Sequence, residues 1–208
     1  MPGGVSALSG YLRDLGIDAS RAQLAQFQAH FDILLRWNAK TNLTSVRDPD
    51  EILRRHFAES AYLTRVLPLG PGTLIDVGSG GGFPGIPAKI LSAETRVILV
   101  ESVTKKAAFL KEAARAVGLP GLEVVSGRFE DLPDTDLSKS DAQWLTMRAV
   151  RLDSQLISHI RRIVPRGTLA IFMGEADAHS LTGVTIRPIP RSERRVIAIG
   201  SCSTWNIS

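Results

Sequence analysis

A glycine-rich segment in the first half of the chain is the clearest candidate for binding chemistry. Residues 74–85 read Leu-Ile-Asp-Val-Gly-Ser-Gly-Gly-Gly-Phe-Pro-Gly. Gly78, Gly80 and Gly82 let the backbone turn sharply and bring its N–H groups close to a ligand. An apolar run precedes these glycines and a helical pattern follows them. A strand, a glycine turn and a helix in that order are typical of a site for a nucleotide-like ligand.

A second acidic side chain stands at the end of the next predicted strand. Glu101 follows the apolar run at residues 96–100, about 20 residues beyond the glycines, which is the distance expected in a dinucleotide fold. A carboxylate at that place accepts hydrogen bonds from both hydroxyls of a ribose. We therefore expect a ligand that contains a ribose, and a purely structural glycine turn is the weaker explanation.

The spacing of the glycines and the acid before them bear on which ligand this is. Gly80, Gly82 and Gly85 fit the dinucleotide spacing, which leaves a nicotinamide cofactor as an alternative. Asp76, however, opens the pattern Asp-x-Gly-x-Gly-x-Gly of S-adenosylmethionine methyltransferases. Its carboxylate suits the ammonium and sulfonium charges of that cofactor and would repel a pyrophosphate. We expect S-adenosylmethionine, bound through Asp76, Gly78, Gly80 and Gly82.

Alternating strand and helix patterns surround the glycine segment and predict the fold that positions it. Strands are expected at residues 73–77, 96–100, 123–126, 144–147 and 169–173, with helices at 84–91, 104–117 and 153–164. This alternation predicts a mostly parallel sheet with right-handed crossovers. Two further runs, 184–189 and 195–199, should pair antiparallel at one edge. The expected fold class is α/β, with a Rossmann-like methyltransferase sheet.

The first 70 residues predict helices that support this sheet. Ser20 and Gln23 have the spacing of a capping box, and the apolar positions after them share one helical face: Leu24, Phe27, Phe31 and Leu34. Residues 37–42 favour turns and predict an interruption of that helix. Asp48 and Pro49 predict a second helix. The Gly-Pro-Gly at 70–72 then divides a helical N-terminal extension, residues 1–70, from a methyltransferase domain, residues 71–208.

The composition is that of an ordinary globular protein with a mild positive charge. The 208 residues are 44% hydrophobic, and 25 Lys and Arg against 21 Asp and Glu give a net charge of +4. This excess suits a polyanionic partner but is too small to require one. Cys202 is the single cysteine, so no disulfide framework is expected. Without a signal-peptide pattern or an apolar run of roughly 20 residues, we expect a cytoplasmic protein.

Several short stretches together resemble a known family. They run in family order from residue 37 to 149, with a weaker trace at 190–197, and the most specific is the glycine stretch at 78–85 that ends in Phe-Pro-Gly. The others are Trp37-Asn38, Asn42-Leu43-Thr44, His56 with Glu59-Ser60, Glu101-Ser102, Lys105-Lys106, Phe109-Leu110, Gly127-Arg128-Phe129-Glu130 and Thr146-Met147-Arg148-Ala149. The chain thus resembles the small-subunit ribosomal RNA methyltransferases G of bacteria (RsmG, also called GidB).

The resemblance implies an activity. Members of this family methylate N7 of a guanosine in 16S ribosomal RNA, so the expected partner is that RNA or the small ribosomal subunit. N7 has a lone pair and no proton, so no general base is needed, and the sequence identifies no catalytic residue. Glu59 and Glu101 stand where the family commonly has Asp, and both exchanges keep the charge.

The resemblance also implies roles for particular residues in cofactor binding. Gly78 and Phe83 would border S-adenosylmethionine, and Glu101 would hold its ribose. Phe129 and Glu130 would flank its adenine. These are expectations carried over from matching positions of the family.

Basic residues near the ends of predicted strands are candidates for substrate contact. Arg148, at the end of the fourth strand, would face the cofactor or the incoming base. Arg128, Lys105 and Lys106 are candidates for contact with RNA, although lysines on an amphipathic helix commonly form a solvated face. His56 and Glu59 would face the cofactor pocket, or would make a hydrogen bond on the surface of their helix or between the two parts of the chain.

Other functions remain open from the sequence. The same fold acts on small molecules or proteins in other methyltransferases, and an apolar rim around the pocket would favour such a substrate over RNA. A nicotinamide-dependent oxidoreductase and a non-catalytic binding module are further alternatives. We expect a monomer that binds no metal, because the histidines show no spacing typical of a metal site.

Overall fold

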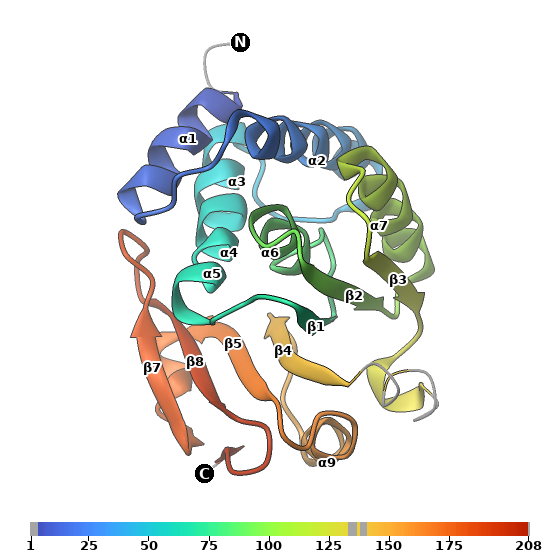
Figure 1. Ribbon diagram of the computed structural model, residues 1–208, viewed down its shortest axis with the longest axis vertical. Coiled ribbons are helices and arrows are strands. Elements are labelled where there is room, and N and C mark those ends of the chain that lie inside the picture. Colours follow the sequence, from blue (N-terminus) through green and yellow to red (C-terminus); the bar gives the residue numbers. More distant parts are fainter. Residues whose placement is uncertain (1–3, 133–136, 138–140, 208) are drawn as a thin grey trace.

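A seven-stranded sheet forms the centre of the computed structural model, which describes residues 4–132, 137 and 141–207 (Figure 1). The strand order is β3-β2-β1-β4-β5-β8-β7. The parallel strands are β1 (Gly72–Val77), β2 (Thr95–Glu101), β3 (Leu122–Ser126), β4 (Ala142–Arg148) and β5 (Thr168–Gly174). β8 (Arg195–Ser201) is antiparallel to both of its neighbours, β5 and β7 (Val184–Pro188). The predicted fold class and antiparallel edge are confirmed.

Helices cover both faces of the sheet, each face over its own hydrophobic cluster. α6 (Gly85–Leu91), α7 (Thr104–Val117) and the N-terminal helices cover one face, and α9 (Ser154–Ile163) covers the other (Figure 1). Successive residues of a strand point to opposite faces. Accordingly Leu74 joins the first cluster and Ile75 the second. A sheet buried on both faces requires such continuous apolar strands.

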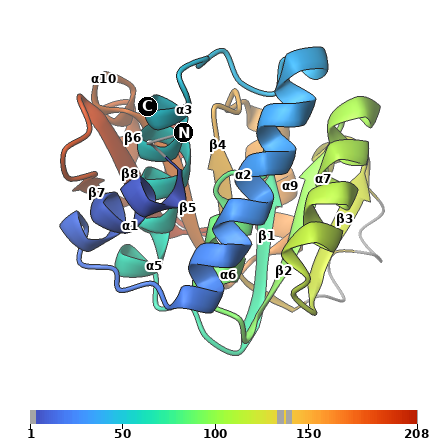
Figure 2. The ribbon, with the colours of Figure 1, turned by 90° about the horizontal axis from the view of Figure 1, so that it is seen from above.

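The N-terminal region begins with α1 (Val5–Asp14) and the long helix α2 (Arg21–Thr41). The predicted capping box at Ser20 and Gln23 is present. Figure 2 shows α2 beside α7 on the same face of the sheet. The predicted interruption at residues 37–42 is wrong, because the helix continues to Thr41 and ends at Asn42 with a positive φ of 44°. Trp37 explains the difference: its Nε1–H donates to Glu112 of α7, so a tertiary contact overrides the local turn preference.

The second predicted helix forms, but with a change of winding in its middle. Asp48 caps α3 (Pro49–Ile52) by accepting a hydrogen bond from the backbone N–H of Glu51. The chain continues as the π-helix η1 (Leu53–Ala58) and then as α4 (Glu59–Ala61) and α5 (Leu63–Val66). The wider turn of a π-helix is uncommon and is frequent at functional sites. Here it carries two residues of the candidate site, Arg55 and His56.

The remaining elements are short, and the sequence did not predict them. They are the 3₁₀ turn η2 (Phe129–Asp131), the helix α10 (Glu175–Ala178) and a small antiparallel sheet of β6 (Leu181–Thr182) and β9 (Asn206–Ile207). Buried side chains from Leu8 to Ile197 belong to one cluster, so the N-terminal helices pack directly on the sheet. The domain division at residue 70 stays a prediction. Within the described ranges, no helix combines the length and apolar character needed to cross a bilayer.

Candidate active site

The glycine segment forms a tight turn between β1 and α6 at the carboxyl edge of the sheet. Gly78, Gly80 and Gly82 all have positive φ angles, of 70°, 56° and 85°, which side chains disfavour. The N–H groups of Gly78 and Ser79 both donate to the carbonyl of Val100 at the end of β2, at 2.9 and 3.1 Å. The turn is therefore anchored to the neighbouring strand, as a strand–turn–helix binding loop requires.

Glu101 lies directly against this turn. One carboxylate oxygen accepts the N–H of Gly80 at 2.8 Å, and the other accepts the N–H of Val103 at 2.8 Å. The residue is 5% exposed, yet each oxygen retains acceptor capacity beyond the bond it makes. The structure thus brings Glu101 and the glycines together as expected, and its contact with a ribose stays a prediction.

Asp76 is the most perturbed acid beside the turn. It is fully buried, and its Oδ2 accepts the N–H of Gly85 at 3.0 Å, while Oδ1 has no hydrogen-bond partner. Burial raises the pKa of Asp76 to about 7, and the nearby charge of Glu101 adds to the increase. A buried carboxyl with a free oxygen suits a cationic ligand group, because a positive charge would stabilise its ionised form. The residues present fit an S-adenosylmethionine amino group.

A cavity opens on the other side of β1, at the carboxyl ends of β4 and β5. Its volume is about 660 Å³, and it is lined by η1, the segment after β4, α10 and the start of β8. Its basic residues are Arg55, Arg148, Arg151 and Arg195. Val150, which also lines it, stands so close to the glycine turn that a Cβ on Gly78 would lie 2.7 Å from it. The turn and the cavity are therefore neighbours.

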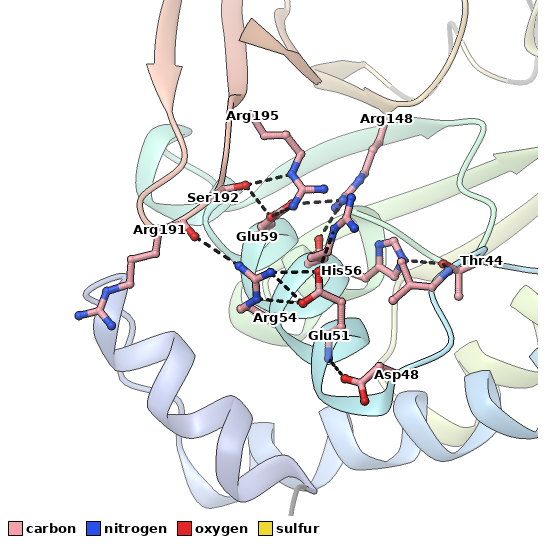
Figure 3. A network of polar contacts seen from close by, with 12 residues as sticks. Thr44, Asp48, Glu51, Arg54, His56, Glu59, Arg148, Arg191, Ser192 and Arg195 are labelled. Carbon is pink, nitrogen blue, oxygen red and sulfur yellow. Dashed lines mark hydrogen bonds and ion pairs between the residues drawn. The ribbon is translucent and has the colours of Figure 1, made fainter.

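A buried ionic network forms one wall of the cavity (Figure 3). Glu59 Oε2 lies 3.2 Å from Arg148 Nη2, and Glu59 Oε1 lies 2.7 Å from Arg195 Nη2. Ser192 Oγ–H donates to Glu59 Oε1 at 2.7 Å. Arg148 also donates to the Ser60 hydroxyl at 3.2 Å and to the Arg55 carbonyl at 2.8 Å. Burial and neighbouring arginines lower the pKa of Arg148, and Glu59 counters that decrease.

His56 connects the network to the glycine turn. Its ring stacks on Phe83 with the centroids 5.3 Å apart, and its Nε2 lies 2.6 Å from the Thr44 hydroxyl oxygen. Burial, followed by the charges of Arg148, Arg55 and Arg195, lowers the pKa of His56 to about 3. His56 is therefore neutral at physiological pH. The structure places His56 and Glu59 in the lining of the cavity and pairs Glu59 with Arg148 and Arg195, and a position facing the cofactor stays a prediction.

The other predicted site residues lie toward β2 and β3. Phe129 is buried with its ring edge-on to His159, 4.8 Å between centroids, and Glu130 beside it is half-buried. Arg128 is exposed near Asp131, at 3.8 Å. Lys105 is exposed and Lys106 half-buried at the start of α7. These residues and the cavity lie on opposite sides of β1, because β2 and β3 flank it on one side and β4 and β5 on the other.

Sequence reasoning missed the roles of Arg55 and Arg195 at the cavity. In the sequence, Arg195 is one of three arginines at positions 191–195, and nothing local indicates that it pairs with Glu59 from another part of the chain. Among the described residues, no group of three or more His, Cys, Asp or Glu side chains is arranged to hold a metal ion.

The buried acid of the glycine turn predicts a pH dependence of stability. Folding raises the pKa of Asp76 from 3.8 to about 7. The protonated side chain therefore adds to the free energy of unfolding in full below pH 3.8, and this contribution is lost as the pH rises toward 7. At one pKa unit per about 1.4 kcal/mol, the loss is on the order of 4 kcal/mol. Without cofactor, Asp76→Asn should lose correspondingly less stability than the wild type between pH 4 and pH 8 in urea unfolding. The exposed Asp18→Asn is the control, and parallel curves for Asp76→Asn and wild type would contradict the assignment.

The ionic network predicts a large effect of neutralising its centre. Glu59→Gln leaves two largely buried guanidinium groups without their negative partner, which should lower the free energy of unfolding by about 3 kcal/mol or more. Glu123→Gln is the matched control, because its pair with Arg96 is exposed and should contribute less than about 1 kcal/mol. Equal losses in the two variants, measured by urea unfolding, would show that the network is not a central stabilising contact.

Comparisons with known proteins identify a family for this chain. A family model described as rRNA small subunit methyltransferase G matches residues 23–196. Ribosomal RNA small subunit methyltransferase G 1 of Syntrophobacter fumaroxidans is 39% identical over 161 residues, covering 76% of this chain and 71% of that protein. Ribosomal RNA small subunit methyltransferase G of Lachnoclostridium phytofermentans is 38% identical over 121 residues, covering 58% of this chain and half (50%) of that protein.

A solved structure supports the fold. The crystal structure of a SAM dependent methyltransferase from Aquifex aeolicus superposes with a TM-score of 0.58 at 15% identity, covering 76% of this chain and 97% of that one. This likeness confirms the expected fold class. The methyltransferase family whose model matches residues 23–196 supports S-adenosylmethionine as the cofactor. The chain belongs to the rRNA small subunit methyltransferase G family.

Proposed function

We propose that this protein transfers a methyl group from S-adenosylmethionine to N7 of a guanosine in 16S ribosomal RNA. Membership of the family carries this proposal, and the alternative of a nicotinamide oxidoreductase loses its support with it. The rim of the cavity also favours RNA over an apolar small molecule, because Arg55, Arg151 and Arg195 line it. Guanidinium groups bind phosphate through paired N–H donors.

The cofactor would be held on the β1–β2 side by the glycine turn, Asp76 and Glu101. When bound there, S-adenosylmethionine supplies a methyl group whose bond to sulfur breaks as the bond to N7 forms, which leaves S-adenosylhomocysteine. The chain needs no base, since N7 of neutral guanine carries no proton. His56 agrees with this requirement, because burial first, and then the charges of the neighbouring arginines, lower its pKa to about 3, so the ring is not poised to accept a proton.

The task of the chain is therefore to align the base with the methyl group and to exclude water. Holding two reactants in line contributes about 7–11 kcal/mol to lowering a barrier. Phe172 and Arg148 line the cavity and are placed to position the base there. The guanidinium carbon of Arg148 lies 5.8 Å from the centre of the Phe172 ring. We expect the enzyme to act as a monomer in the cytoplasm, where ribosomal RNA is found.

Methyl transfer to small ribosomal subunits tests the proposal directly. Subunits that lack this modification should accept radiolabelled methyl from S-adenosylmethionine, and borohydride–aniline treatment should then cleave the RNA at one guanosine. Label without such cleavage would place the methyl group on another atom. No label, with S-adenosylmethionine still bound, would contradict RNA as the substrate and favour a small molecule or protein.

The arginine rim predicts where the RNA lies. Arg151→Ala should weaken binding of the RNA roughly fivefold and lower the salt dependence of log Kd by about one unit per phosphate lost. S-adenosylmethionine binding should stay within twofold of the wild type, which separates the two sites. Filter binding at several salt concentrations measures the effect.

Two matched variants make that test sharper. Arg166→Ala removes an exposed arginine before β5, at the opposite edge of the sheet, and should leave RNA binding unchanged. Lys105→Ala tests the contact with RNA expected from the sequence on the β2 side. An Arg151→Ala variant with the salt dependence of the wild type would contradict the rim as a phosphate contact.

A further inference from the structure

A fully buried histidine of α2 lies directly beneath the glycine turn. His30 Nε2 is 2.8 Å from the carbonyl oxygen of Gly81, and the residue is 0% exposed. A carbonyl only accepts hydrogen bonds, so Nε2 must carry the hydrogen and donate. Nδ1 is then the bare nitrogen, and it has no hydrogen-bond partner. Burial lowers the pKa of His30 to about 4, so this neutral form holds at physiological pH.

Aromatic rings fix the imidazole in this orientation. The ring centroids of Phe57, Phe83 and Phe109 lie 4.9, 5.1 and 6.3 Å from that of His30. Phe83 itself belongs to the glycine turn. A Cβ on Gly82 would lie 3.1 Å from His30 Nε2, so the backbone of the turn rests on the imidazole edge. The donor therefore cannot swing away without disturbing a packed core.

The same turn is held from its other side by Glu101. Gly80 donates its N–H to Glu101, and the next residue, Gly81, accepts from His30. Two adjacent glycines are thus held in place: Glu101 accepts the N–H of Gly80, and His30 donates to the carbonyl of Gly81. Glycine loses more conformational freedom on ordering than other residues, so a turn of this composition gains most from such restraints.

We propose that His30 is a positioning residue for the cofactor: its Nε2–H holds the Gly81 carbonyl and so pre-orders the turn that binds S-adenosylmethionine. The identity of the ligand rests on the proposed function. A helix of the N-terminal extension thereby sets the affinity of a site built on β1 and β2, although His30 is fully buried and does not line the cavity.

Substitutions that separate the donor from the ring test this role. His30→Phe keeps an aromatic ring and removes the donor, which should raise the Kd for S-adenosylmethionine about tenfold, as expected for an unsatisfied buried carbonyl. His30→Gln restores an N–H donor of similar reach and should bind within about threefold of the wild type. Phe27→Leu, one turn earlier on α2 and equally buried, should lower the melting temperature without changing the Kd.

A measurement on the unaltered protein covers the case in which a variant does not fold. Long-range ¹H–¹⁵N spectra should show His30 as the Nε2–H tautomer, and its Nε2 signal should move when S-adenosylmethionine is added. An Nδ1–H tautomer, or a His30→Phe Kd equal to that of the wild type, overturns the proposal. Equal weakening by Phe and Gln would assign the effect to ring packing and would also overturn it.

A failure of the His30 proposal can be distinguished from a failure of the proposed methyl transfer to RNA. If the wild type binds S-adenosylmethionine but does not methylate ribosomal subunits, the substrate is wrong and the His30 test still stands. If the wild type binds no S-adenosylmethionine, the identity of the cofactor fails, and the tautomer still decides whether His30 holds the turn.

Discussion

The carboxylate of Glu59 joins three parts of the chain that are far apart in sequence. Removing a carboxylate from water is strongly unfavourable unless opposite charges and hydrogen bonds replace the lost hydration. Glu59 meets this condition with Arg148 from the end of β4, and with Arg195 and Ser192 from the β7–β8 hairpin. These partners reach it only if the N-terminal helices, β4 and β8 meet at one edge of the sheet. Pairing the buried carboxylate of Glu59 with Arg148 and Arg195 therefore requires the same arrangement of elements that encloses the cavity.

Charge is divided along the carboxyl edge of the sheet. On the β1–β2 side the groups next to the glycine turn are acidic, and Asp76 keeps one carboxyl oxygen without a partner. On the β4–β5 side the cavity wall is arginine-rich. A cofactor with ammonium and sulfonium charges suits the first side, and a polyanion suits the second. Val150, wedged against Gly78, marks where the two sides meet.

Local signals in the sequence predicted most of the fold, and long-range contacts account for what they missed. The bounds of α7 and its glycine end, and the cap at Ser20, follow from residues within a few positions. The continuation of α2 past Trp37 depends on Glu112, which lies 75 residues away. In the site, the glycine spacing located the turn and Glu101. Its support by His30 and the pairing of Arg195 with Glu59 have no local pattern, because they arise only when distant elements pack.

The late position of the β7–β8 hairpin has a consequence for the order of folding. Ser192 closes on a partner 133 residues earlier in the chain, and Arg148 on one 89 residues earlier. During synthesis, Glu59 leaves the ribosome long before either arginine that neutralises it. A nascent chain must therefore keep Glu59 hydrated, and its N-terminal helices cannot reach their final packing until β8 has formed. Contacts of such separation slow folding, so the cavity beside Arg148 and Arg195 is expected to be among the last parts of the molecule to assemble.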